Sequence, residues 1–197
     1  MLEKTALKET SCMVSVDAPP AVLGSVPEDA LDHKRPHFTL AYVRLSDDVA
    51  ERTEQMDLIK SIMDDFCLTV PAVSAGVLAG ADVFETQPPE GKTFEEMGET
   101  PKSVICRRPT PGFFGWLFAT ANRLQAKFEA AGLPVSRFKK FEPHITLKVI
   151  PAEERQAFEV EGGMFDYASL PEVTFPVNDL HLHRYTDEHY TYPLRSG

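Results

Sequence analysis

The chain has 197 residues, of which 43% are hydrophobic and 25% charged, a composition typical of a globular protein with a continuous core. Its formal net charge of -10 argues against coating of a long nucleic acid, because such affinity rests on many lysine and arginine contacts to phosphates. No stretch approaches the roughly 18 to 20 apolar residues of a membrane span, and residues 1–10 lack an apolar signal core. We therefore expect a cytoplasmic protein with a small phosphorylated substrate and no membrane partner. We expect residues 1–197 to form one domain or two tightly packed lobes.

The first third of the chain predicts two strands and a long helix. Residues 11–16 have the apolar and β-branched character of a short strand, and the prolines that follow end it. Residues 37–45 form a strongly apolar run rich in strand formers. Ser46 can cap the next helix, because apolar residues recur at helical spacing over residues 46–66.

The middle of the chain predicts strands separated by a long loop. Residues 70–84 mix Val, Ala, Gly and Leu without a helical period, which favours one or two strands with a kink at Gly76 or Gly80. Residues 85–102 contain several prolines and glycines and few apolar residues, so we expect an exposed loop there. A strand at residues 103–107 should follow.

The last part of the chain predicts a second long helix, a strand and a hairpin. Thr110 can cap the helix, which should stop at Gly132. A strand is expected at residues 141–150, and residues 173–185 and 189–194 are expected to form a closing hairpin. The two halves of the chain resemble one another in this order of elements. We therefore predict an α+β protein with two pseudo-equivalent lobes that face each other across a cleft.

Two matching motifs lie in predicted strands, Pro-His-Phe-Thr-Leu at residues 36–40 and Pro-His-Ile-Thr-Leu at residues 143–147. Because residues two apart in a strand point to the same face, each motif projects one imidazole and one hydroxyl together. The apolar residues between them should anchor the strand in the core. A single pattern of this kind is common in strands, but two of them, each preceded by proline, indicate one shared site.

The residue types in these motifs suit phosphodiester cleavage, which needs a base for the nucleophile and an acid for the leaving oxygen. We predict that His37 and His144 are the catalytic pair, in either order, because histidine fills both roles near neutral pH. Thr39 and Thr146 would bind the substrate by holding its phosphoryl oxygens without a metal. Lys148 lies two residues beyond Thr146, so we expect it on the same face as a further phosphate contact, unless it is simply a solvated strand-end lysine.

The two motifs resemble the hallmark motifs of the two-histidine (2H) phosphoesterase superfamily, which includes the LigT-type 2′-5′ RNA ligases and cyclic phosphodiesterases. The resemblance extends to residues 26–31 before the first motif and to the helices that flank the motifs. It also includes a last strand at residues 179–182, followed by Tyr190 or Tyr192. It thus covers almost the whole chain from Ser11 onward.

This resemblance implies a bilobal fold in which two antiparallel-sheet lobes with outer helices enclose a central cleft. It implies no metal or other cofactor, and catalytic histidines beside phosphate-binding threonines. The implied substrates are small nucleotides, cyclic oligonucleotides or RNA ends. They carry a 2′,3′-cyclic phosphate, a 2′-5′ linkage or a cyclic nucleotide phosphodiester.

Other residues allow more than one interpretation. Tyr190 and Tyr192 would bind substrate by stacking on a base, although their alternation is equally typical of an edge hairpin. His181 and His183 share a strand face and suggest a metal site together with the motif histidines. We favour ordinary strand residues, because no Asp, Glu or Cys accompanies the pair at ligand spacing.

Several remaining residues are expected to be structural. The three cysteines lack C-x-x-C spacing, so we expect buried free thiols rather than disulfides or zinc ligands. Phe113, Phe114 and Trp116 should belong to the core. Arg107 and Arg108 lie at the end of a strand, where they would either contact a second phosphate or, as we expect, simply be solvated.

Two other functions remain open at this point. The same cleft in a binding protein would sequester a nucleotide or an RNA end without turnover. The same chemistry run in reverse would join RNA ends. Formation of product by the chain separates catalysis from sequestration.

Overall fold

The computed structural model describes residues 10–24, 26–27, 31, 35–88, 91–136, 141–160, 167, 170–184 and 188–196. The middle of the predicted hairpin turn, at residues 185–187, lies outside this description, as do residues 28–30 of the segment before the first motif. Within the described part, no helix is long and apolar enough to cross a membrane.

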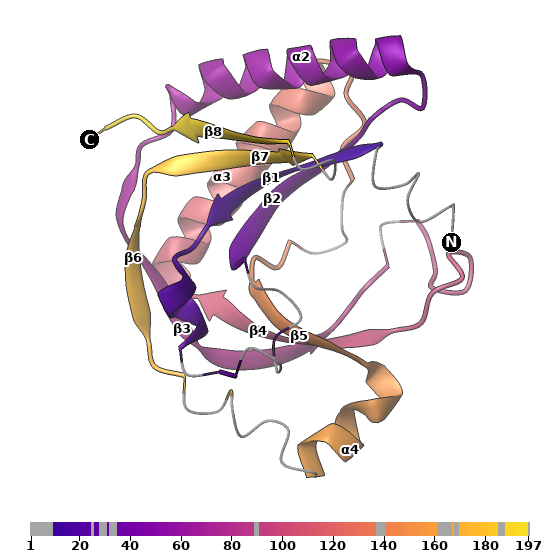
Figure 1. Cartoon of the computed structure of the whole chain (residues 1–197), viewed down its shortest axis with the longest axis vertical. Helices are drawn as coiled ribbons and strands as arrows, with labels where there is room; N and C mark the ends of the chain where they lie inside the picture. The colour runs from indigo at the N-terminus through magenta and orange to yellow at the C-terminus, as the bar shows by residue number, and fades with distance from the viewer. Residues whose placement is uncertain are drawn as a thin grey trace.

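The first sheet has four antiparallel strands in the order β2-β1-β7-β8 (Figure 1). One face of this sheet is apolar and packs against two helices, whereas the other face carries mainly polar side chains. Val14, Phe38 and Leu182 are fully buried on the apolar face. The strands are β1 (Ser11–Asp17), β2 (His37–Arg44), β7 (Asp179–Arg184) and β8 (His189–Pro193).

The second sheet also has four antiparallel strands, in the order β5-β4-β3-β6. Its longest strand, β3, has register irregularities between Val73 and Gly76 and between Leu78 and Ala81, which agrees with the predicted kinks near Gly76 and Gly80. The strands are β3 (Val73–Glu85), β4 (Lys102–Pro109), β5 (Ile145–Pro151) and β6 (Val173–Val177).

Two long helices cover the first sheet, with α2 lying along it and α3 passing behind it, while α4 lies beside the second sheet (Figure 1). Helix α2 begins after Asp48, whose carboxylate accepts the backbone N–H of Glu51 at 2.9 Å. The predicted cap, Ser46, is therefore wrong by two residues, because a better-placed acceptor follows it. The helices are α2 (Val49–Cys67), α3 (Pro111–Ala130) and α4 (Arg155–Val160), with 3-10 turns η1 (Pro20–Leu23) and η3 (Ala152–Glu154).

The C-terminal strands correct the predicted hairpin. The single strand predicted from residue 173 onward is two strands, β6 and β7, because the chain passes from the second sheet to the first at Asn178. Val177 pairs with Val73 in the second sheet, whereas β7 pairs with β1 and β8 in the first. The two lobes are thus not the two halves of the chain, since both ends of the chain contribute to the first sheet.

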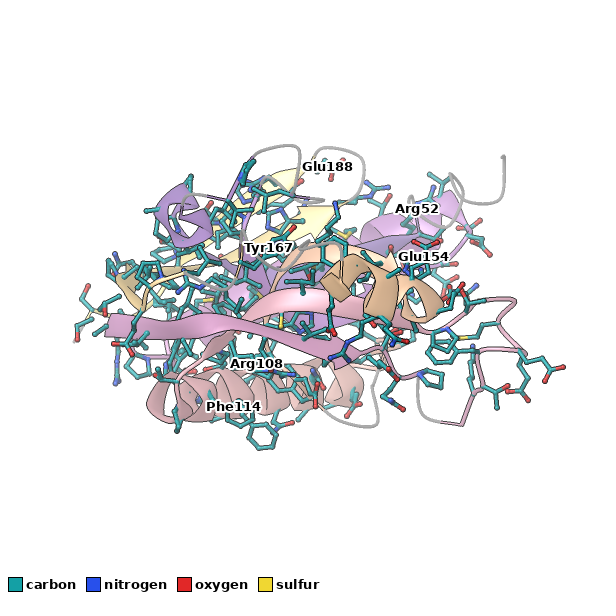
Figure 2. The ribbon with its side chains drawn as sticks, turned by 90° about the horizontal axis from the view of Figure 1, so that it is seen from below. Arg52, Arg108, Phe114, Glu154, Tyr167 and Glu188 are labelled. Carbon is teal, nitrogen blue, oxygen red and sulfur yellow. The ribbon has the colours of Figure 1, made fainter. Side chains whose placement is uncertain are left out.

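Burial confirms part of the expected core. Phe113 is buried and packs edge to face on Phe38 at 5.5 Å between ring centroids, and Trp116 packs against the core. Phe114 was predicted in the core but is 38% exposed and points outward from α3 (Figure 2). Cys12, Cys67 and Cys106 are buried free thiols, as predicted, and burial raises the pKa of each to about 12.

Candidate active site

The two motif strands occupy equivalent places, since β2 and β5 are the edge strands of their sheets. The two edges contact one another near the centre of the molecule (Figure 1). The fold therefore brings together two segments that are more than 100 positions apart in the sequence.

Burial along both motifs follows the predicted alternation. Phe38 and Leu40 are buried, while the alternating residues His37 and Thr39 are only half-buried. The second motif repeats this pattern, with its apolar residues buried and its histidine and threonine half-buried. One detail differs from the prediction, because β5 begins at Ile145 and His144 lies one residue ahead of it.

Each motif strand also carries a bulge immediately after its threonine. In the first sheet Ser15 pairs with Thr39 and Val14 with Ala41, so Leu40 is the extra residue. In the second sheet Leu147 is the extra residue in the same position of the motif. A bulge bends a strand and redirects its side chains, and its presence in both motifs gives the two sites matching backbone geometry.

Both imidazoles are held in the same way by the backbone. Nδ1 of His37 donates to the carbonyl oxygen of Arg35 at 2.9 Å, and Nδ1 of His144 donates to that of Glu142 at 2.6 Å. Because a carbonyl oxygen only accepts hydrogen bonds, each Nδ1 must carry the hydrogen. Proton transfer by either ring would therefore use Nε2.

His144 lies in an apolar and cationic environment. Its ring packs edge-on against Phe84 at 4.6 Å between centroids, and the guanidinium of Arg108 covers the same phenyl ring at 5.0 Å. Burial lowers the pKa of His144, the hydrogen bond to Glu142 opposes this, and the charges of Arg108 and His37 lower it further. The contact of β2 with β5 brings the two motif strands together, and His37 is among the groups that lower the pKa of His144.

Neither arginine at the end of β4 is simply solvated, so that prediction is wrong. Arg108 forms ion pairs with Asp82 and, at 3.5 Å, with Glu142, which brings a cation beside His144. Arg107 is fully buried and donates to main-chain carbonyls. Sequence alone named Arg108 as a contact to a second phosphate and did not name Phe84; both lie near His144 through the pairing of β3, β4 and β5.

The motif hydroxyls have little competition for hydrogen bonds. Among the residues that the structure describes, Thr39 Oγ1 contacts a weak acceptor alone, the sulfur of Met13 at 3.3 Å. Thr146 has no hydrogen-bonding partner for its hydroxyl among the residues that the structure describes. Both hydroxyls can therefore serve an external acceptor or donor.

The expected position of Lys148 is wrong, because of the bulge. Thr146 pairs with Cys106 on β4, whereas Lys148 pairs with Ile105. Ile105 and Cys106 are neighbours on β4, so their side chains point to opposite faces. Because paired residues share a face, Lys148 and Thr146 lie on opposite faces of the second sheet. Because Leu147 is the extra residue of the bulge, two positions in the sequence no longer correspond to the same face of the strand.

The C-terminal tyrosines also lie away from the motif imidazoles. Tyr192 and Tyr190 pair with Leu180 and Leu182, whose side chains belong to the apolar face of the first sheet. Tyr192 is 7% exposed, and the ring of Tyr190 lies against Lys60 of α2 at 4.4 Å. The prediction that they stack on a base beside the motif histidines is therefore wrong.

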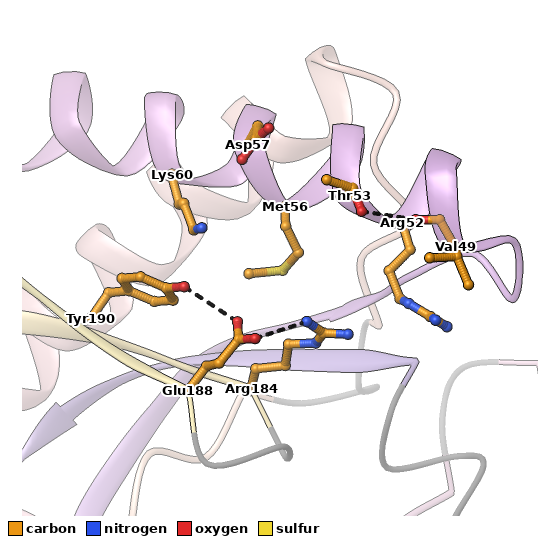
Figure 3. A pocket seen from close by; sticks show the side chains of 9 residues that line it. All are labelled: Val49, Arg52, Thr53, Met56, Asp57, Lys60, Arg184, Glu188 and Tyr190. Carbon is orange, nitrogen blue, oxygen red and sulfur yellow. Dashed lines mark hydrogen bonds and ion pairs between the residues drawn. The ribbon is translucent and has the colours of Figure 1, made fainter.

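A pocket of about 320 Å³ lies on this helix-covered side of the first sheet, between α2 and β8 (Figure 3). Its walls carry both signs of charge, and Glu188 already pairs with Arg184 at 3.2 Å and accepts from Tyr190 at 3.2 Å. The pocket is separated from the motif imidazoles by the sheet itself. It is therefore not the site that the motifs define.

The polar face of the first sheet contains a histidine cluster beside the first motif. Residues paired across β1, β7 and β8 share one face, which brings His181, His183 and His189 together with Asp17. The rings of His183 and His189 stack at 4.5 Å, and those of His181 and His189 at 5.1 Å. The sequence argument that no acid accompanies the histidines is therefore wrong, because Asp17 arrives from a different strand.

The charge states in this cluster are shifted. Burial alone would raise the pKa of Asp17, but hydrogen bonds with His183 and Ser15 and the nearby imidazoles outweigh it, so that its pKa falls well below the usual range. Burial lowers the pKa of both His181 and His189. These shifts favour the ionised form of Asp17 and the neutral forms of His181 and His189.

Comparison with known proteins gives a likeness in fold. No family model and no curated protein matches the chain. The chain is similar to Usb1 of Kluyveromyces marxianus, with 12% identity over 95% of this chain and 99% of that chain and a TM-score of 0.53. A structure of the same protein with uridine monophosphate gives 13% identity, the same coverage and a TM-score of 0.53. E. coli LigT complexed with 3′-AMP gives 15% identity over 94% and 95% of the two chains and a TM-score of 0.45. The likeness to Usb1 confirms the predicted fold class.

Proposed function

We propose that this chain, which has the α+β fold of the two-histidine phosphoesterases, hydrolyses a phosphodiester with His37 and His144 as its acid–base pair. The observation that carries the proposal is the matched presentation of the two imidazoles. Each comes from an edge strand of a different sheet, and each has its Nδ1 held by the carbonyl two residues earlier in the chain. Such a pair suits a reaction that needs one base and one acid.

In the proposed reaction, His144 is the base and His37 the acid. Burial favours the neutral form of His144, whose Nε2 can then take a proton from a water molecule as its oxygen attacks phosphorus. The bond from phosphorus to the ribose oxygen breaks, and that oxygen receives its proton from His37. The product is a phosphomonoester, and exchange with solvent restores both imidazoles.

The threonines and Arg108 would stabilise the phosphoryl group. Charge develops on its non-bridging oxygens in the transition state, and fixed donors aimed at that charge are a major source of rate. Thr39 and Thr146 lie on the rigid motif strands, each two residues from its imidazole. Arg108 adds a guanidinium whose position is set by Asp82 and Glu142. This chemistry uses no metal ion.

The substrate we propose is a small or terminal ribonucleotide phosphodiester: a 2′,3′-cyclic phosphate, a 2′-5′ linkage or a cyclic oligonucleotide. The net charge of -10 is unsuited to a long polyanion, while one guanidinium beside the imidazoles suits a single phosphate. The structure of Usb1 with uridine monophosphate supports a nucleotide as the ligand of this fold.

The test is a panel of 2′,3′-cyclic nucleotides, 2′-5′ oligoadenylate and cyclic di- and trinucleotides, incubated with the chain in the presence of a chelator. We expect hydrolysis of at least one member and loss of that activity in His144→Gln. Tight binding without product over hours would instead favour a protein that sequesters nucleotides. Joined RNA ends in place of hydrolysis products would favour a ligase.

A further inference from the structure

The histidine cluster on the polar face of the first sheet brings three side chains that can bind a metal close together. One ligand atom from each of Asp17, His183 and His189 lies within 4.8 Å of the other two. The separation of Asp17 Oδ1 from His183 Nε2 is 3.4 Å. Ligands bound to zinc at about 2.0 to 2.2 Å in a tetrahedron stand about this far apart from each other.

We propose that Asp17, His183 and His189 bind a divalent transition-metal ion. Two imidazoles and one carboxylate are ligands that zinc and related ions accept, and they leave a fourth position for water or another ligand. The three residues come from β1, β7 and β8, whose pairing fixes them on one face. The pairing of these strands therefore preorganises the three ligands before an ion binds.

The contacts of Arg35 show that these atoms attract a cation. Its Nε lies 3.2 Å from Asp17 Oδ2, and its Nη2 lies 3.4 Å from His189 Nε2, so one guanidinium bridges two of the three ligands. The Arg35 side chain is 60% exposed and can swing into solvent when an ion takes its place. A phosphate is the less suitable occupant, because Asp17 would repel it.

Ser15 and His181 contact the three proposed ligands. The hydroxyl of Ser15 donates to Asp17 Oδ1 at 2.8 Å and lies 2.9 Å from His183 Nε2. Nδ1 of His181 lies 3.1 Å from His189 Nε2. Both contacts are made to Nε2 of a proposed ligand, so an ion bound by these two nitrogens would replace them.

The proposed ion is independent of the proposed hydrolysis, which uses the motif imidazoles and no metal. Asp17 pairs with His37 across the first sheet, so the ion would lie beside the first motif without replacing any of its groups. Removal of the metal and removal of a catalytic imidazole should thus have separate effects.

The test is calorimetric titration of the chelator-treated full chain with Zn²⁺, with Co²⁺ absorption in the visible range as a second measure of coordination. We expect one Zn²⁺ per chain. His189→Ala and Asp17→Asn should weaken binding by roughly 100-fold or more, since even changes beside a metal ligand cost about 10- to 100-fold. His189 is exposed, so its loss should leave the fold intact.

Two further variants make the result specific. Arg35→Ala should tighten Zn²⁺ binding roughly tenfold, because it removes a competing positive charge, and a damaged fold cannot give that result. His144→Gln should bind Zn²⁺ as wild type does while losing hydrolysis. Wild-type binding below one equivalent would overturn the proposal. So would equal affinity of wild type, Asp17→Asn and His189→Ala, which indicates zinc bound elsewhere.

Discussion

Replacement of Arg107 by methionine should destabilise the chain severely, although the residue lies only two positions from the end of β4. The guanidinium is fully buried and donates to the carbonyl oxygens of Ala79, Val22 and Pro171. It therefore ties β4 to β3, to the η1 turn and to the segment before β6. Ile145, the residue after His144, pairs directly with Arg107.

The magnitude follows from what methionine leaves behind. Its apolar stem fills part of the space, but the carbonyl groups of Val22, Ala79 and Pro171 lose a charged donor, the first in a buried and the others in a partly buried contact. Each hydrogen bond to a charged group contributes about 1.5 to 3 kcal/mol. Loss of the buried charge itself offsets part of this, because its desolvation was costly. We expect a net decrease of about 3 to 5 kcal/mol in the free energy of unfolding, a large share of the 5 to 15 kcal/mol typical of a native protein.

Urea denaturation, followed by fluorescence and circular dichroism, measures this decrease. Arg123→Met is the matched control, because this exposed arginine of α3 donates to a single hydroxyl, Thr69 Oγ1 at 3.1 Å, and should lose less than about 1 kcal/mol. Equal stabilities of the Arg107 and Arg123 variants would refute the claim that the Arg107 network holds the second sheet together.

Three further predictions concern the site and the core. The base must be neutral and burial lowers the pKa of His144, so the acidic limb of the kcat/KM profile should have an apparent pKa below the ordinary histidine value of 6.5. Phe84→Ala uncovers the His144 ring and should raise this apparent pKa in a pH–rate profile. Thr39→Val and Thr146→Val should each lower kcat by about 100- to 1,000-fold in steady-state assays, and serine at either position should retain most of it. An unchanged kcat in the valine variants would exclude phosphate contacts. Gly76→Ala should lower the free energy of unfolding by about 1 to 3 kcal/mol in urea, since its Cβ would lie 2.9 Å from a core phenylalanine ring; full stability would contradict this packing.

Local patterns in the sequence were sufficient for the motif strands and the long helices. The two-residue period of each motif already separates the half-buried imidazole and hydroxyl from the buried apolar pair. Gly132, with φ of 79°, ends the segment after α3 as its sequence position suggested. These features depend on neighbours within a few residues, so one sequence suffices to predict them.

Features that depend on partner strands were not predictable in this way. The bulge that turns Lys148 away from Thr146 exists only in the pairing of β5 with β4. The passage from one sheet to the other at Asn178 is set by partner strands, because β6 pairs with β3 whereas β7 pairs with β1 and β8. Asp17 and His183 are far apart in the sequence, and only the pairing of β1 with β7 brings them together.

The most direct test of the central claim is hydrolysis by the variant His37→Ala, His144→Ala, compared with wild type on whichever nucleotide is turned over, with a chelator present. His181→Ala is the matched control, because this histidine belongs to the polar face but not to the motifs. We predict that each motif variant alone loses about 100- to 10,000-fold in rate, that the double variant forms no detectable product, and that His181→Ala remains active. Product formation by the folded double variant at the wild-type rate would contradict the assignment of the two imidazoles as acid and base.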